Sequence, residues 1–132
     1  MYDGDHGPID LQQRAANGYI VWPLALLDLF REPAEATAWT RLHTRQAFVY
    51  GLVATLGYLV LLALPLLIVI PFSSISTTAV IWIYVLGLLA DVAAAVVLFG
   101  LTLRFRERAL RGELFSIPLV TPLADRLFRL DR

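Results

Sequence analysis

The chain has 132 residues, of which 58% are hydrophobic and 17% are charged, whereas globular domains average about 45–50% and about 25%. This composition excludes a disordered chain, and so small a body has no interior large enough to hide that much apolar surface from water. Eleven basic and eleven acidic residues cancel, so no net charge attracts nucleic acid, and the lack of cysteine excludes disulfides and thiol chemistry. We expect an all-α integral membrane protein with a single membrane domain over residues 1–132.

The first apolar segment, residues 15–30, contains a proline and Asp28, and as a helix it would rise only about 24 Å, short of the roughly 30 Å hydrocarbon core. We expect a short membrane segment here, with a re-entrant or interfacial helix as alternatives. Residues 36–38 (Ala-Thr-Ala) are typical of a signal cleavage site, but the residues before Arg14 are acidic, so we expect no signal peptide. Asp28 and Arg31, three residues apart, are expected to form a local pair.

A much longer apolar stretch follows. From Gln46 to Ala90 no residue carries a charge and none is histidine. One span needs about 20 residues, so this stretch is long enough for two. Proline and five hydroxyl residues interrupt it at residues 71–78. We therefore expect transmembrane helices over residues 46–72 and 79–103, joined as a helical hairpin that satisfies every backbone polar group within lipid.

Arginines indicate the orientation of this hairpin. The 31–45 loop has three arginines and the tail after the second span has seven, whereas the hydroxyl-rich loop has none. The positive-inside rule predicts that the 31–45 loop and the C-terminus lie in the cytoplasm of a bacterium, with the chain crossing the inner membrane several times. The arginines at positions 104, 106, 108 and 111 fit either an ordinary stop-transfer flank or attraction to anionic headgroups.

The C-terminal tail predicts an amphipathic cytoplasmic helix over residues 121–131. Thr121 is expected to be its N-cap, with a proline at the first helical position. Leu123, Leu127 and Leu130 then lie on one stripe. Such a stripe fits the membrane surface, and docking onto a partner subunit would give the same pattern.

Two stretches carry a family resemblance. Residues 41–47 (Arg-Leu-His-Thr-Arg-Gln-Ala) resemble an R-F-H-x-x-Q-A signature, and residues 109–125 resemble an A-x-x-G-x-x-x-x-I-P-x-I-G-x-x-A ending. Both are typical of a widespread family of small bacterial membrane proteins of unknown function, distantly similar to the twenty-kilodalton channel component of the chloroplast Tic translocon. The chain departs from this ending at residues 120–122 (Val-Thr-Pro), where the family has Ile-Gly after the proline. The resemblance implies a helical-bundle membrane protein involved in transport or assembly, with no catalytic residue.

Asp91 is the most informative side chain because it lies near the middle of the second predicted span. An ionisable group at that depth costs at least about 2.5 kcal/mol, so it normally faces protein or water. An antiparallel hairpin brings Thr55 and Tyr58 to a similar level, and Gly87 on the face of Asp91 allows close helix approach. Three roles stay open, namely an interhelical hydrogen bond, an ion pair with another subunit, and movement of protons or ions.

His43 and Arg41 lie at the predicted membrane boundary, where they suit lipid headgroups or a partner carboxylate; a titrating switch is the alternative for His43. No enzyme motif is present, so we expect neither catalysis nor a metal or cofactor. The predicted function is a small non-catalytic accessory or scaffold subunit whose partners are membrane lipids and larger integral membrane subunits or further copies of itself. The alternative is an oligomeric transport or protein-translocation component resembling the Tic channel family.

Overall fold

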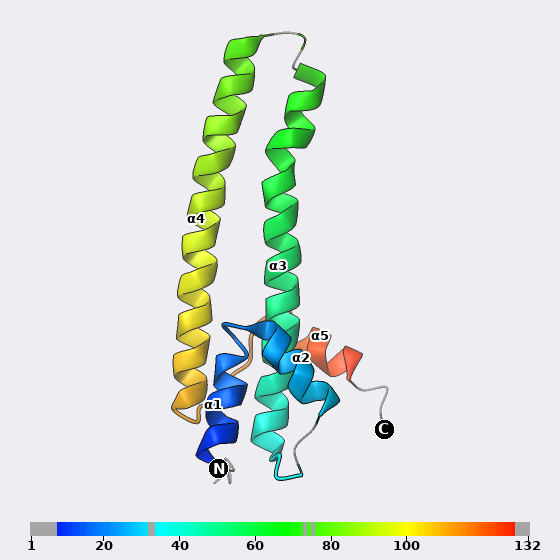
Figure 1. Ribbon diagram of the computed structural model, residues 1–132, viewed down its shortest axis with the longest axis vertical. Coiled ribbons are helices and arrows are strands. Elements are labelled where there is room, and N and C mark those ends of the chain that lie inside the picture. Colours follow the sequence, from blue (N-terminus) through cyan, green and yellow to red (C-terminus); the bar gives the residue numbers. More distant parts are fainter. Residues whose placement is uncertain (1–7, 32–33, 73, 75, 129–132) are drawn as a thin grey trace. The chain divides into compact units, whose positions relative to one another are not determined.

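The computed structural model describes residues 8–31, 34–72, 74 and 76–128, and its regular elements in these ranges are helices only. They are α1 (Ile9–Asn17), α2 (Trp22–Phe30), α3 (Ala38–Phe72), α4 (Thr77–Leu110) and α5 (Val120–Leu127) (Figure 1). The chain divides into two units. The terminal unit comprises residues 1–53 and 101–132, and the hairpin unit comprises residues 54–100. The predicted all-α fold is confirmed for the described residues.

The helices α3 and α4 are long and apolar enough to cross a membrane, over Ala38–Pro71 and Thr77–Leu110. In the hairpin unit they run antiparallel and side by side (Figure 1), which confirms the predicted helical hairpin. Both helices extend beyond the predicted spans, because α3 begins eight residues before residue 46 and α4 ends seven residues after residue 103. The predicted bounds depend on hydropathy, which indicates where a lipid-embedded segment ends. A helix can continue beyond that point, because arginine and leucine both have high helix propensity.

The N-terminal segment differs from the prediction. Residues 15–30 do not form one helix, because a turn at Gly18–Ile20 separates α1 from α2. Pro23 stands in the first turn of α2, where its missing N–H costs no helical hydrogen bond. Each helix has nine residues and rises about 14 Å, less than half of a hydrocarbon core. The structure therefore does not confirm a short span here.

The C-terminal helix also begins differently. Its N-cap is Leu119, with φ 69°, and α5 starts at Val120, so the expected N-cap at Thr121 is wrong. Before it, α4 ends in a Schellman motif. Gly112 has φ 73°, its N–H donates to the carbonyl of Ala109, and the next N–H donates to the carbonyl of Arg108. A turn of this hand leads the chain away from α4 into the 111–119 loop.

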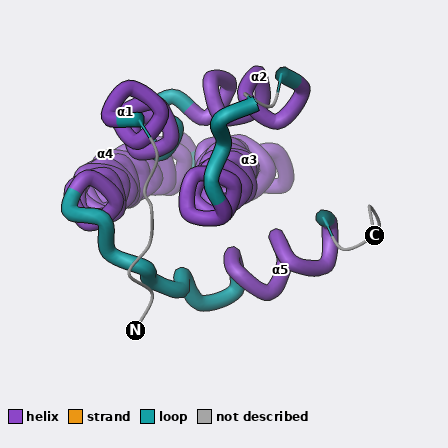
Figure 2. The backbone as a smooth tube through the Cα atoms, turned by 90° about the horizontal axis from the view of Figure 1, so that it is seen from below, coloured by secondary structure: helices purple, strands orange, loops and turns teal. Residues whose placement is uncertain are grey.

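Within the terminal unit, α1 and α2 lie on one side of α3 and α4, and α5 lies on the other side (Figure 2). Small residues allow these close approaches. A Cβ atom at Gly51 of α3 would overlap the side chain of Trp22 in α2. Asp28 of α2 forms its ion pair with Arg14 of α1, and not with Arg31 as expected. The pair links the two short helices to each other.

Candidate functional site

The terminal unit has an aromatic core around Tyr19, which lies in the turn between α1 and α2 and is buried. Its ring lies 6.0–6.2 Å from four other rings, those of His43, Tyr50, Phe105 and Phe115. These rings come from α3, α4 and the 111–119 loop. Tyr19 thus contacts α3, α4 and the 111–119 loop. Burial raises the pKa of its hydroxyl well above the usual value of 10.

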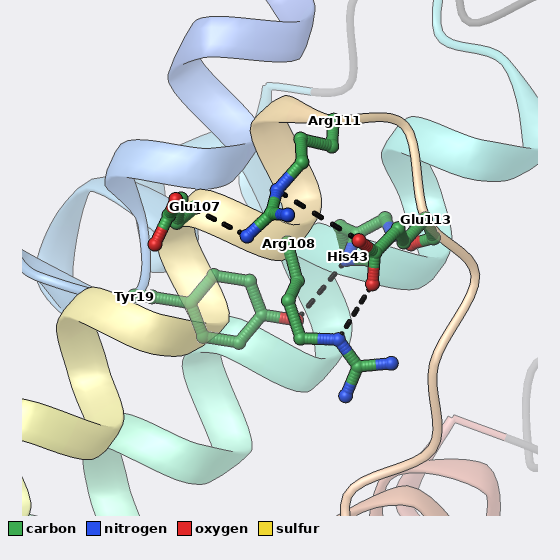
Figure 3. Close-up of polar contacts among 6 residues, drawn as sticks. All are labelled: Tyr19, His43, Glu107, Arg108, Arg111 and Glu113. Atoms are coloured by element: carbon green, nitrogen blue, oxygen red, sulfur yellow. Dashed lines mark hydrogen bonds and ion pairs between the residues drawn. The ribbon is translucent and has the colours of Figure 1, made fainter.

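His43 of α3 is fully buried at the centre of this core. Its Nε2 lies 3.2 Å from the carbonyl oxygen of Glu113, and its Nδ1 lies 3.1 Å from the hydroxyl of Tyr19 (Figure 3). A carbonyl oxygen only accepts, so Nε2 carries the hydrogen. The expected contact of His43 with lipid headgroups is wrong, because the 111–119 loop and the α1–α2 turn cover the ring.

Gln46 lies one turn after His43 on the same face of α3 and is also buried. Its amide nitrogen donates to the carbonyl of Phe115 at 3.3 Å and to the hydroxyl of Thr121 at 3.1 Å. Its amide oxygen accepts from the hydroxyl of Tyr19 at 3.2 Å. Tyr19, His43, Gln46 and Thr121, together with the backbone of the 111–119 loop, are called the His43 cluster below.

Thr121 lies at the position where the chain departs from the resembled ending, and its side chain has a structural role there. Its hydroxyl accepts from the backbone N–H of Ile117 at 2.9 Å as well as from Gln46. The side chain therefore closes the turn before α5 and ties that turn to α3. The two stretches that carry the resemblance, residues 41–47 and 109–125, thus meet in space through side chains of the first and through two backbone carbonyls and the Thr121 hydroxyl of the second.

The hydroxyl of Tyr19 has one hydrogen and two neighbours that accept it, the amide oxygen of Gln46 and the bare Nδ1 of a neutral His43. If Tyr19 donates to Gln46, its oxygen is still free to accept from Nδ1 of His43, and if it donates to His43, the oxygen of Gln46 loses that donor. The cluster therefore has two hydrogen-bond arrangements, one for each acceptor of the Tyr19 hydroxyl.

Two of the arginines after the predicted second span, Arg108 and Arg111, bind within the chain. Arg108 donates to a carboxylate oxygen of Glu113 at 2.7 Å and lies 4.5 Å over the ring of Phe115. Arg111 pairs with Glu107 at 3.1 Å and with Glu113 at 3.8 Å (Figure 3). The hydrogen bond from Arg108 holds the pKa of Glu113 below its usual 4.5, and the charges of Arg108 and Arg111 act in the same direction.

The remaining predicted residues of the terminal unit are on its surface. Arg41 is exposed on α3. Leu123 and Leu127 of α5 are 40% and 51% exposed, whereas Val120 and Ala124 form the buried side of that helix. Leu130 lies outside the described residues. The predicted leucine stripe is therefore not the face that α5 packs against its own chain.

In the hairpin unit the predicted residues surround Asp91. Among the described residues of this unit, Asp91 is the one buried side chain, with 7% of its surface exposed. Its Oδ1 has no hydrogen-bond partner among the described residues, so the expected bonds from Thr55 and Tyr58 to this oxygen are not formed. Gly87 lies one turn earlier, where a Cβ atom would overlap the ring of Pro65 in α3. The close helix approach predicted at Gly87 is thus present.

Sequence reasoning missed the roles of Tyr19, Gln46 and Phe115. The signal available was the i, i+3 spacing of His43 and Gln46, two polar residues on one face at the start of an apolar helix. Their partners are backbone carbonyls about 70 positions later, which no side-chain pattern marks. The described residues hold no group of three histidine or acidic side chains placed to bind a metal ion.

Compared with known proteins, the chain matches no protein-family model, no curated protein and no solved structure. The resemblance carried by residues 41–47 and 109–125 stays a prediction. The fold and the site define a class by themselves: an α-helical protein with two helices fit to span a membrane and a buried polar cluster at one end of them.

Proposed function

We propose that this chain is a non-catalytic accessory or scaffold subunit of a larger complex in the bacterial inner membrane. The observation that carries this proposal is Asp91, the one buried side chain among the described residues of the hairpin unit. A carboxyl group deep in an apolar helix normally faces protein, and its oxygens need donors. Because Oδ1 has none among the described residues, a partner subunit is the natural source of one.

The His43 cluster supports a non-catalytic role. Its side chains form hydrogen bonds to one another and to carbonyls of the 111–119 loop, and this loop connects α4 to α5. Such an arrangement fixes the terminal unit as a rigid platform. The exposed leucines of α5, Leu123 and Leu127, give this platform an apolar face for a partner or for the membrane surface.

Paired substitutions at Asp91 test the proposal. If a partner donor bonds to Asp91, then Asp91→Asn keeps an acceptor and preserves co-purification of the complex in mild detergent, whereas Asp91→Leu weakens it by on the order of 1 kcal/mol. Ala93→Leu, at an exposed position of α4, is the matched control and leaves assembly unchanged. Equal assembly of the Asn, Leu and control variants contradicts the scaffold proposal.

An oligomeric transport or translocation component is the second candidate, and the same carboxyl group favours it. A carrier of protons or ions must change its charge, so Asp91→Asn abolishes function as fully as Asp91→Leu does, although the complex still assembles. A fully assembled but inactive Asn variant therefore replaces the scaffold proposal with this one.

The proposed orientation places the C-terminus and the 31–45 loop in the cytoplasm, on the strength of the arginine distribution. The chain has no cysteine, so single cysteines report orientation cleanly. Ser74→Cys, in the exposed turn between α3 and α4, reacts with an impermeant thiol reagent added to intact spheroplasts. Ala36→Cys reacts only after the membrane is opened. The reverse pattern overturns the orientation but not the scaffold proposal.

A further inference from the structure

A cavity of about 380 Å³ lies in the terminal unit, lined by residues of α1, α2 and α3 and by Phe128 after α5. Its volume is within the range of about 300–1,000 Å³ typical of small-molecule sites. The His43 cluster does not line it, and neither proposed function uses it. Its walls are of two kinds, charged and apolar.

The charged wall favours an anion. Arg14, Arg41 and Arg45 line the cavity with one acidic residue, Asp28, so the lining carries a formal net charge of +2. Asp28 is in an ion pair with Arg14. Arg41 and Arg45 are four residues apart on α3 and therefore project from one face, about 6 Å apart along the axis. Guanidinium groups at this spacing suit the oxygens of one phosphate, which they bind through paired N–H donors.

Arg45 contacts another residue that lines the cavity, Phe128. Its guanidinium carbon lies 5.1 Å from the ring centroid of Phe128, a cation–π contact. A cation–π contact uses the charge of the guanidinium and requires none of its N–H groups as hydrogen-bond donors. The contact therefore orients a phosphate-binding group without using its donors.

The apolar wall favours an acyl chain. The stretch without charge or histidine begins at Gln46, directly after Arg45, and Phe48 lines the cavity from within that stretch. Beside it, α2 contributes Leu26, Leu29 and Phe30 to the lining, whereas its exposed residues Leu24 and Leu27 do not line the cavity. A short helix with an exposed apolar face fits the membrane interface. Arg41 and Arg45 therefore lie directly before the uncharged stretch, and Phe48 lies within it.

We infer that this cavity binds the phosphate of an anionic phospholipid, with Arg41 and Arg45 on the headgroup and Phe48 against the glycerol and first acyl carbons. A zwitterionic headgroup adds a cation beside its phosphate, which the positive lining disfavours. The inference rests on the membrane location proposed above, but not on the scaffold role or on Asp91.

The full chain in detergent micelles, given phosphatidylglycerol and phosphatidylcholine of equal chain length, tests this site by native mass spectrometry of the retained lipid. Wild type retains phosphatidylglycerol in preference. Arg45→Gln lowers that retention about fivefold, and Arg41→Gln with Arg45→Gln lowers it about 25-fold. Arg126→Gln removes one charge from an exposed position outside the cavity and leaves retention unchanged.

A second variant separates the cavity from general surface charge. Leu26→Trp keeps every arginine and fills the apolar side of the cavity, so it also lowers phosphatidylglycerol retention. Its helical content and elution volume, compared with wild type, show that it is folded. Retention that falls as much in Arg126→Gln as in Arg45→Gln, or that survives Leu26→Trp in the folded protein, overturns the site.

Millimolar inorganic phosphate distinguishes the two sources of a phosphate group. It leaves the lipid bound if the acyl contacts contribute, and full displacement of the lipid shows a free-phosphate site and overturns the inference. Fractionation of cells checks the membrane location separately. Recovery in the membrane fraction with no arginine dependence defeats the lipid site alone, whereas recovery in the aqueous fraction defeats both proposals.

Discussion

The two units of this chain are stabilised in different ways. In the terminal unit, buried polar side chains such as His43 and Gln46 bond to partners within the chain, and a cluster of aromatic rings surrounds them. In the hairpin unit, most described residues are apolar and exposed or half-buried, and the one buried side chain among them is a carboxyl group with an oxygen that has no partner among the described residues. The parts of α3 and α4 in the terminal unit are thus held by buried polar contacts within the chain, whereas the described parts in the hairpin unit are not.

The difference teaches that apolar content alone does not define a membrane helix pair. A hairpin in lipid gains little from apolar contact, because lipid tails are equally apolar, so close packing and polar contacts decide how the helices associate. The terminal unit has its own polar contacts and is specified by its sequence. In the hairpin unit, α3 and α4 approach closely at Gly87, and the carboxyl group of Asp91 has one oxygen without a donor among the described residues.

The largest expected effect is at Gln46 in the terminal unit. Gln46→Met keeps the side-chain volume but removes both donors and the acceptor, so the carbonyl of Phe115 and the hydroxyls of Tyr19 and Thr121 each lose their hydrogen bond to residue 46. We expect the free energy of unfolding in micelles to fall by about 3 kcal/mol. Gln13→Met, at an exposed position of α1, is the control and changes it little. Equal stability of the two variants would remove the contrast between the units.

A smaller effect is expected in the hairpin unit, where packing replaces hydrogen bonding. Gly87→Leu forces a side chain into the ring of Pro65, and we expect helix association to weaken by about 2 kcal/mol. Gly57→Leu is the matched control, because a Cβ atom there meets nothing within 4 Å. Disulfide cross-linking between cysteines introduced at Leu61 of α3 and Ala90 of α4, which line the same groove as Pro65 and Gly87, is the measurement in both leucine variants. Equal cross-linking and melting of both leucine variants counts against the close approach.

Backbone strain before α5 gives a third, smaller effect of opposite sign. Leu119 has a positive φ and is 85% exposed, so its side chain contributes little packing while its Cβ opposes the conformation. Leu119→Gly is expected to raise the free energy of unfolding by about 1 kcal/mol. Leu114→Gly, an exposed leucine of the same loop without positive φ, is expected to lower it slightly. A loss of thermal stability in Leu119→Gly would show that the turn is unstrained.

The smallest effect depends on pH and concerns the loop that covers His43. The pKa of Glu113 is lowered in the folded state, so its contribution to stability is complete above its usual 4.5 and is lost as the pH falls through the lowered value. Proteolysis of the 111–119 loop should therefore accelerate in acid. In the Glu113→Gln variant, the rate of proteolysis of this loop should not change with pH over the same range. A wild-type rate that is also flat would mean that the Arg108 pair does not hold the loop.

The sequence predicts the hairpin well and the terminal unit poorly, for one physical reason. An uninterrupted apolar stretch and a hydroxyl-rich break at residues 71–78 are local signals, and the structure places the turn between α3 and α4 there. The His43 cluster depends on contacts between residues 69, 70 and 75 positions apart, and two of the three acceptors in these contacts are backbone carbonyls. Residue type does not encode such acceptors. The sequence therefore predicts His43 at the lipid surface, whereas in the structure the 111–119 loop covers it.

That same separation fixes the order of events during synthesis. His43 and Gln46 leave the ribosome some 70 residues before the carbonyls of Glu113 and Phe115 that bind them. Throughout that interval the side chains of His43 and Gln46 have been synthesised, but the 111–119 loop that supplies their carbonyl acceptors has not. The terminal unit is therefore completed only after α4 has been translated, and a nascent chain stalled before residue 113 should expose the face of α3 that the finished protein conceals.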